Sequence, residues 1–112
     1  MTDSSIHASG TASYAGGIDV QAYGQASHAS GIGNKAFNIA EHAEGNYNVS
    51  HTSIENIQNT PANVGNTQHS VGIGNYDASS GNITRKNAME TMQNGDIYIN
   101  GLGGYTGTDT NA

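Results

Sequence analysis

Cysteine and tryptophan are absent from this 112-residue chain, and proline and phenylalanine each occur once. Without cysteine, disulfide bonds and thiolate chemistry are excluded. Lys35, Arg85 and Lys86 are the only basic side chains, and the formal net charge is -6. Because phosphate groups are bound by clusters of basic side chains, we expect no nucleic acid partner. The sequence also lacks a run of about 18 apolar residues and a signal-peptide pattern, so we expect no membrane insertion.

Large apolar side chains are also scarce. Hydrophobic residues make up 34% of the chain, charged residues 11%, and 16 residues are glycine. Ordering the backbone costs about 1–2 kcal/mol per residue, and short side chains bury little apolar area against that cost. We therefore expect self-association, in which several copies bury one face together and complete the core.

What the sequence does contain is a period of seven residues, which is typical of repeat architectures. Residues 4–52 divide without remainder into seven heptads: SSIHASG, TASYAGG, IDVQAYG, QASHASG, IGNKAFN, IAEHAEG and NYNVSHT. The fifth position is alanine in six of them, and the seventh is glycine in five. Alternate heptads resemble each other more closely than neighbours do, so the repeating unit is fourteen residues long.

A glycine in almost every heptad argues against a coiled coil, because glycine costs about 1 kcal/mol in a helix interior. Four or five extended residues followed by a glycine with positive φ form a short strand and a turn instead. We predict an all-β fold, a parallel β-roll or β-solenoid of about 14 residues per coil. The expected turn glycines are Gly10, Gly17, Gly24, Gly31 and Gly45.

In such a fold, residues fourteen apart lie one above another at a spacing of about 4.8 Å. The first predicted column comprises Tyr14, His28, His42 and Asn56, and the second comprises His7, Gln21, Lys35 and Val49. Two alanine ladders are predicted inside the fold, one of Ala12, Ala26 and Ala40 and one of Ala15, Ala29 and Ala43. Tyr14, His28 and His42 form a candidate surface-binding column. Tyr23 and Phe37 are expected to pack on each other.

Four segments carry a resemblance to known repeats: HASG at 7–10, SHASG at 27–31, EHAEG at 41–45 and SVGIG at 70–74. They resemble the head repeats of trimeric autotransporter adhesins, whose consensus is SVAIG, although Gly72 replaces the alanine. A closer resemblance is to phage and prophage tail-fibre proteins with Ser-His-Ala-Glu-Gly repeats, in which the repeats precede a segment similar to residues 85–99.

The resemblance implies a left-handed roll, a homotrimer and a non-enzymatic, host-recognition role in a virion tail. The partner would be a host cell-surface glycan or protein receptor. The alternative is the head domain of a bacterial trimeric adhesin, which would lie at the bacterial cell surface.

The sequence divides into four predicted regions. These are the repeat β-roll at 4–59, an irregular insertion and resumed coil at 60–84, a capping β-hairpin at 85–102 and a flexible tail at 103–112. Asn94-Gly95 predicts the hairpin turn, because a type I′ turn needs positive φ at both positions. This turn would place Met92 opposite Ile97 and Glu90 opposite Ile99. Ala88, Met92, Ile97 and Ile99 would then share a buried face.

Five histidines suggest a metal site, but stacked His28 and His42 could share an ion only if a third ligand converged on it. Glu41, Glu44 and a histidine of a neighbouring chain are candidates, and Glu41 should point to the face opposite His42. We expect the histidines to serve as interface or surface hydrogen-bonding residues, with no metal and no cofactor. Serine and histidine are plentiful, yet no triad is indicated, so we expect no catalytic residues. A metal-dependent or self-cleaving enzyme is the remote alternative.

Overall fold

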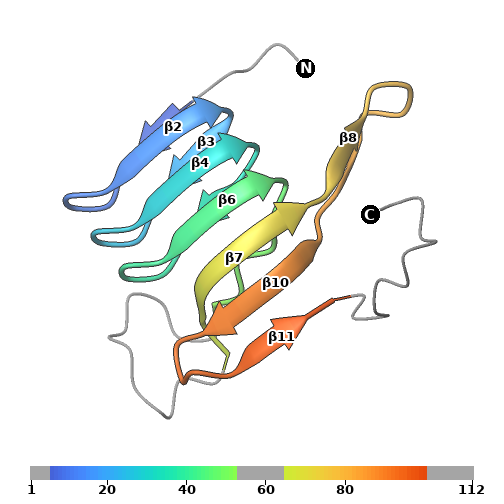
Figure 1. The fold of residues 1–112 in the computed structure, drawn as a ribbon. Coiled ribbons are helices and arrows are strands. Elements are labelled where there is room, and N and C mark those ends of the chain that lie inside the picture. Colours follow the sequence, from blue (N-terminus) through green and yellow to red (C-terminus); the bar gives the residue numbers. More distant parts are fainter. Residues whose placement is uncertain (1–5, 53–64, 101–112) are drawn as a thin grey trace.

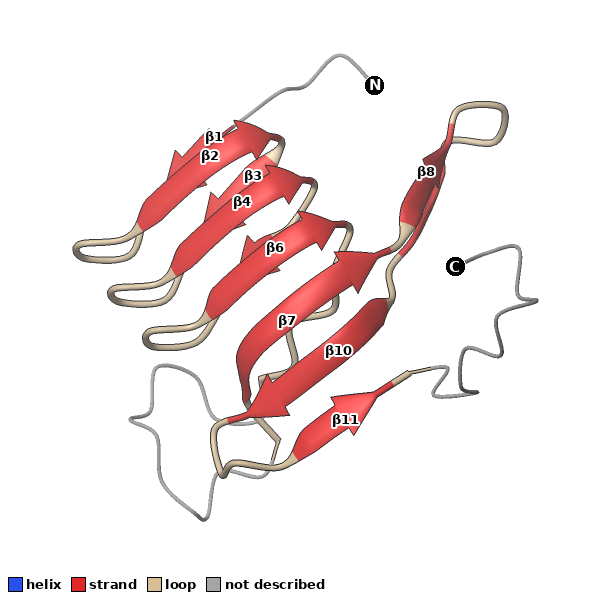
Figure 2. Ribbon diagram, in the orientation of Figure 1, coloured by secondary structure: helices blue, strands red, loops and turns tan. Residues whose placement is uncertain are grey.

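The computed structural model describes residues 6–52 and 65–100. Of these residues, 54% lie in strands and none lies in a helix, which confirms the all-β class (Figure 2). The described part of the chain therefore offers no helix that could cross a membrane. The predicted flexible tail at 103–112, Asn56 of the first column and most of the insertion before residue 65 lie outside the described residues.

The largest element is a six-stranded sheet in the order β11-β10-β7-β6-β4-β2 (Figure 1). Its strands are β2 (Tyr14–Ile18), β4 (His28–Ile32), β6 (His42–Asn46), β7 (Thr67–Ile73), β10 (Asn87–Met92) and β11 (Ile97–Ile99). Neighbouring strands from β2 to β7 pair in parallel, whereas β10 pairs antiparallel with both β7 and β11.

A second sheet of three short parallel strands has the order β1-β3-β5. Its strands are β1 (Ile6–Ala8), β3 (Val20–Ala22) and β5 (Lys35–Ala36). His7 pairs with Gln21 and Gln21 with Lys35, while in the large sheet Tyr14 pairs with His28. These pairings are fourteen residues apart, as the repeat predicts. Each unit thus contributes one strand to each sheet.

Small side chains fill the space between the two sheets. The buried apolar cluster comprises Val20, Ala22, Ala29, Ala36 and Ala43, all at 0% exposure, with Ala15 packed against it. The prediction that Ala15, Ala29 and Ala43 face inward is therefore confirmed. The prediction for the other alanine ladder is wrong. Ala12, Ala26 and Ala40 are exposed turn residues with φ between 56° and 59°.

The turn glycines occur where expected, but two different constraints select them. Gly17, Gly31 and Gly45 have positive φ, as predicted, whereas Gly10 and Gly24 do not. At Gly24 the constraint is space, because a Cβ there would overlap the backbone carbonyl of Asn38 one unit further on. The left-handed conformation in that turn is adopted by Ala26 instead.

The insertion lengthens one unit without breaking the sheet. His42 of β6 pairs with His69 of β7, 27 residues later and thus thirteen more than the repeat. Within the predicted resumed coil at 60–84, β7 pairs in parallel with β6, but the chain after β7 does not form a further parallel strand. Residues 75–84 instead form an antiparallel hairpin of β8 (Asn75–Asp77) and β9 (Asn82–Thr84), which projects from the sheet (Figure 1). Gly81 lies in its loop, where its N–H donates to the carbonyl of Asp77.

The C-terminal hairpin forms at the predicted position with a different register. Asn94 does not have positive φ and Gly95 does, at 96°, so the turn is not type I′. Thr91 pairs with Ile97 and Glu90 with Tyr98, one residue away from the predicted pairing. Since a shift of one residue moves side chains to the other face, the predicted residues do not share a buried face, although Met92 is buried as predicted. Ile97 and Ile99 are 61% and 53% exposed.

The hairpin extends the six-stranded sheet beyond its last parallel strand. β10 pairs along the edge of β7, so the backbone groups of that strand are satisfied by strand pairing. Glu90 faces inward from β10 at 7% exposure. Its carboxylate binds His51 Nδ1 at 2.6 Å and accepts a hydrogen bond from Thr67 Oγ1.

Candidate functional site

A column of four ring side chains crosses the outer face of the six-stranded sheet. Tyr14, His28, His42 and His69 occupy paired positions on β2, β4, β6 and β7. We call these four residues the ring ladder. The alanine that follows each of the first three, and the serine that follows His69, point to the opposite side, because successive residues of a strand alternate between faces. The predicted column of Tyr14, His28 and His42 is thus present, with His69 in the place assigned to Asn56.

The rings of the ladder contact one another along its whole length. His28 and His42 stack with centroids 4.5 Å apart and planes 11° from parallel. Tyr14 lies 4.6 Å from His28 and His69 lies 4.9 Å from His42, both at tilted angles. This stacking holds His28 and His42 each between two ring neighbours, so the orientation of the His42 ring is fixed from both sides.

The environment of His42 disfavours its protonated form. Burial in the column lowers the pKa of His42 below its ordinary value, and positive charge on His28 or His69 would lower it further. Only Glu44 opposes this shift among the groups that act on the ring. His42 is therefore mainly neutral near pH 7, with one ring nitrogen free to accept a hydrogen bond or bind a cation.

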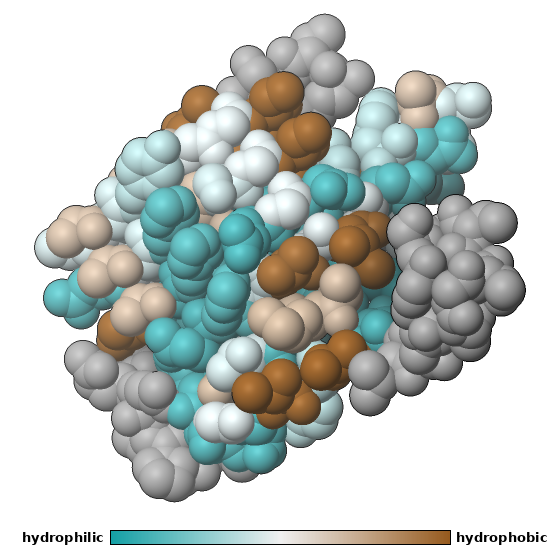
Figure 3. Space-filling view, viewed as in Figure 1, coloured by the Kyte–Doolittle hydropathy of each residue, from teal (hydrophilic) through white to brown (hydrophobic). Residues whose placement is uncertain are grey.

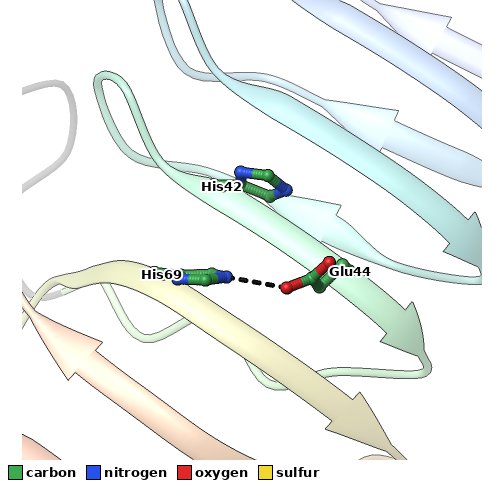
Figure 4. A group of neighbouring side chains, drawn as sticks. All are labelled: His42, Glu44 and His69. Atoms are coloured by element: carbon green, nitrogen blue, oxygen red, sulfur yellow. Dashed lines mark hydrogen bonds and ion pairs between the residues drawn. The ribbon is translucent and has the colours of Figure 1, made fainter.

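Glu44 lies beside the ladder on the same face of β6, two residues after His42. Its Oε2 is 3.0 Å from Nε2 of His69 on the neighbouring strand (Figure 4). Glu44 is 46% exposed and His69 is 34% exposed, so both groups are open to solvent. One donor atom from each of His42, Glu44 and His69 falls within 4.8 Å of the other two. Glu41 is fully buried and takes no part in this group, in keeping with the prediction that it faces away from His42.

Apolar side chains are exposed on strands β2, β4, β7 and β11 of the same sheet. We call this set the isoleucine strip, and each member is 43–61% exposed: Ile18, Ile32, Ile73, Ile97 and Ile99. Ile18 and Ile32 are paired neighbours on β2 and β4. Figure 3 views the molecule from the outer side of this sheet and shows hydrophobic patches beside a hydrophilic band. This face is thus amphipathic, and its apolar side chains remain exposed in the single chain.

The opposite sheet carries a separate aromatic pair. Tyr23 and Phe37 stack with centroids 5.3 Å apart and planes 8° from parallel, which confirms the prediction that they pack on each other. His7 lies on β1 of this sheet and is exposed, so it is on the sheet opposite His28 and His42, as the fourteen-residue unit predicts.

A pocket of about 360 Å³ lies beside the terminal strands and is bordered by His51, Arg85, Lys86, Glu90 and Tyr98. Glu90 and Arg85, two of its charged groups, already have partners within the chain. Arg85 donates from Nη1 to the carbonyls of Gly33 and Asn48 at 2.8 and 3.2 Å, and its guanidinium lies over the Tyr47 ring. These contacts indicate a structural role for Arg85.

The sequence did not predict that His69 and Glu44 lie together beside the ring ladder. A signal for His69 was available, because His28, His42 and His69 are each followed by glycine three residues later. The insertion obscured it by changing the spacing from fourteen to 27. Comparison of the chain with protein-family models, with curated proteins and with solved structures gave no match.

Proposed function

We propose that the chain is a non-enzymatic segment of a phage or prophage tail fibre, built as a homotrimer of left-handed parallel β-solenoids and directed toward the host surface. The tail-fibre assignment and the handedness rest on the resemblance of the HASG, SHASG and EHAEG segments to tail-fibre repeats. The solenoid is supported by parallel pairing at fourteen-residue intervals in two sheets.

The observation that carries the homotrimer is the contrast between a small core and an exposed apolar face. The buried hydrophobic residues of the described chain are four alanines, Val20 and Met92, while the isoleucine strip remains in contact with solvent. Burial contributes about 25 cal/mol per Å² of apolar surface, so covering the strip would add to the small stabilisation that the alanine core provides. A second and a third copy of the same chain supply a matching apolar surface.

This packing also determines where the ring ladder lies in the assembly. The ladder shares its face with the isoleucine strip, so in the trimer it lies at or beside the contacts between copies. Host contact is then left to surfaces outside the trimer interface. Each such surface is presented three times, and weak contacts with a glycan or protein receptor gain by multivalency.

Sedimentation velocity at micromolar concentration tests the assembly. We expect a species of three times the 11.5 kDa chain mass. Ile32→Asp should shift it to smaller species, because the charge enters the strip. Ile83→Asp is the matched control, since Ile83 on the projecting hairpin is also 43% exposed. A folded wild-type monomer, or equal effects of both substitutions, would contradict the proposed interface.

The biological setting has a separate test in the genes that flank this one. A tail fibre predicts neighbours that encode virion structural proteins and fibre assembly factors. An adjoining coding sequence for an export signal and a membrane anchor would contradict the tail-fibre assignment and favour the bacterial adhesin.

A further inference from the structure

Three metal-binding side chains converge at the centre of the outer sheet face. His42 and His69 are cross-strand partners on β6 and β7, and Glu44 follows His42 on the same face. Figure 4 shows the carboxylate of Glu44 directed at the His69 ring, with the His42 ring beside both. The three donor atoms lie no more than 4.8 Å apart, and Oε2 of Glu44 is 3.0 Å from Nε2 of His69.

These distances suit a small divalent cation. Zinc binds imidazole nitrogen and carboxylate oxygen at about 2.0–2.2 Å, which places two ligand atoms in tetrahedral geometry about 3.4 Å apart. The Glu44–His69 separation already satisfies this requirement. The longest separation needs a closing movement of little more than 1 Å, within reach of small side-chain rotations. Two imidazoles and one carboxylate are also a ligand set that zinc and its neighbours in the first transition row accept.

We propose that His42, Glu44 and His69 bind one divalent transition-metal cation of the Zn²⁺ type, with a water molecule completing the coordination. In the single chain, the partly exposed positions of Glu44 and His69 give the ion a path from solvent. The site goes beyond the proposed fibre function and does not depend on it, because all three ligands belong to one chain.

The rest of the ladder acts as a support for this site. His28 stacks on His42 at 4.5 Å and belongs to the ladder, but it is outside the converging group. Its position fixes the His42 ring from the side away from Glu44, in the way that neighbouring groups orient metal ligands. His28 is therefore a positioning residue, and its loss should matter less than loss of a ligand.

Calorimetric titration of the full chain with Zn²⁺ alone tests the site, and titration with Co²⁺ gives a visible spectrum that reports coordination. We expect one ion per chain and a nitrogen- and oxygen-ligated cobalt band. His69→Asn and Glu44→Gln should each weaken zinc binding at least tenfold, because even supporting groups cost 10–100-fold when removed. Using two conservative variants guards against a fold defect in either one.

Two controls separate a built site from general attraction of zinc to surface histidines. His7→Asn removes an exposed histidine that is likewise followed by glycine three residues later, but on the other sheet, and should leave affinity within about twofold. Ile32→Asp should retain zinc binding even where it disrupts assembly, which distinguishes failure of the site from failure of the proposed trimer. Absence of zinc binding in the wild type overturns the proposal. Wild-type affinity in a Glu44→Gln, His69→Asn double variant overturns it as well.

Discussion

Gly24 lies directly against Asn38 in the next fourteen-residue unit, so close that a methyl group on Gly24 would overlap the Asn38 carbonyl. The Gly24 carbonyl accepts a turn hydrogen bond from Ser27 at 3.1 Å, and the Asn38 carbonyl accepts the matching bond from Glu41 at 3.2 Å. The two turns are therefore stacked backbone on backbone. Glycine at position 24 is therefore required by the close approach of the two turns, although its φ is not positive.

Gly24→Ala should destabilise the chain strongly, because the obstacle is rigid backbone and not a movable side chain. Overpacking in well-packed regions costs about 1–3 kcal/mol, and this site falls at the upper end or beyond. Gly81→Ala is a useful control, because Gly81 has positive φ but nothing within 4 Å of an added Cβ. It should cost only about 1–2 kcal/mol through backbone strain. Urea unfolding at fixed protein concentration measures both, and an equal loss in the two variants would argue against the stacking.

The fourteen-residue unit and its strand pairing could be predicted because the repeated residue types fix the register. His28 and His42 recur at the same place in the unit, and they pair in the structure as expected. The sorting of His7 onto the other sheet follows from the same period. The trimer, the receptor and the tail-fibre setting remain predictions.

Other features of the structure could not be predicted from the residue pattern. Asn94 and Gly95 mark a hairpin turn, but the sequence does not reveal that only Gly95 takes positive φ, and this difference shifts the register by one residue. The polar interior was also missed. Asn34 and Asn48 look like loop formers, yet both are buried and replace missing backbone pairing with side-chain hydrogen bonds.

Asn48→Ala should be among the most destabilising single substitutions. The Asn48 side chain accepts from the Lys35 backbone N–H at 2.8 Å and donates to the Lys35 carbonyl and to Ser70 Oγ, both at 2.9 Å. Its removal leaves several buried polar groups without a partner, at about 1–3 kcal/mol each. We expect a loss of roughly 3 kcal/mol or more in urea unfolding. Asn75→Ala, at an exposed position of β8, should change stability little, and comparable losses would show that the Asn48 contacts are unimportant.

The buried carboxyl group of Glu41 should make the free energy of unfolding depend on pH. Its side chain is fully buried, and Oε1 accepts hydrogen bonds from the Asn38 backbone, the Asn38 side chain and Ser50. Oε2 has no hydrogen-bond partner among the described residues. Burial raises the pKa of Glu41 from its ordinary value of 4.5 to about 7, although these hydrogen bonds oppose the shift. The carboxyl group is therefore held mostly neutral in the folded chain below about pH 7.

The folded chain holds the Glu41 proton more tightly than the unfolded chain does, and this difference sets the direction of the pH effect on stability. Between pH 4.5 and about 7 the unfolded chain ionises Glu41 while the folded chain keeps it protonated, so the free energy of unfolding falls as pH rises through this window. The stabilisation is fully present below the unfolded pKa and lost above the folded one. At 1.36 kcal/mol per pKa unit, the loss is on the order of 3 kcal/mol.

Glu41→Gln should abolish this component, because glutamine imitates the neutral carboxyl and can keep the carbonyl oxygen that Asn38 and Ser50 bind. Urea unfolding with a chelator present, from pH 4 to pH 8, should show the variant gaining on the wild type as pH rises. Asp96→Asn removes one negative charge from the exposed hairpin loop and controls for net charge. Parallel curves for wild type and Glu41→Gln would mean that the buried carboxyl ionises without cost. The polar interior around Asn38 would then have to be solvated in a way that its complete burial argues against.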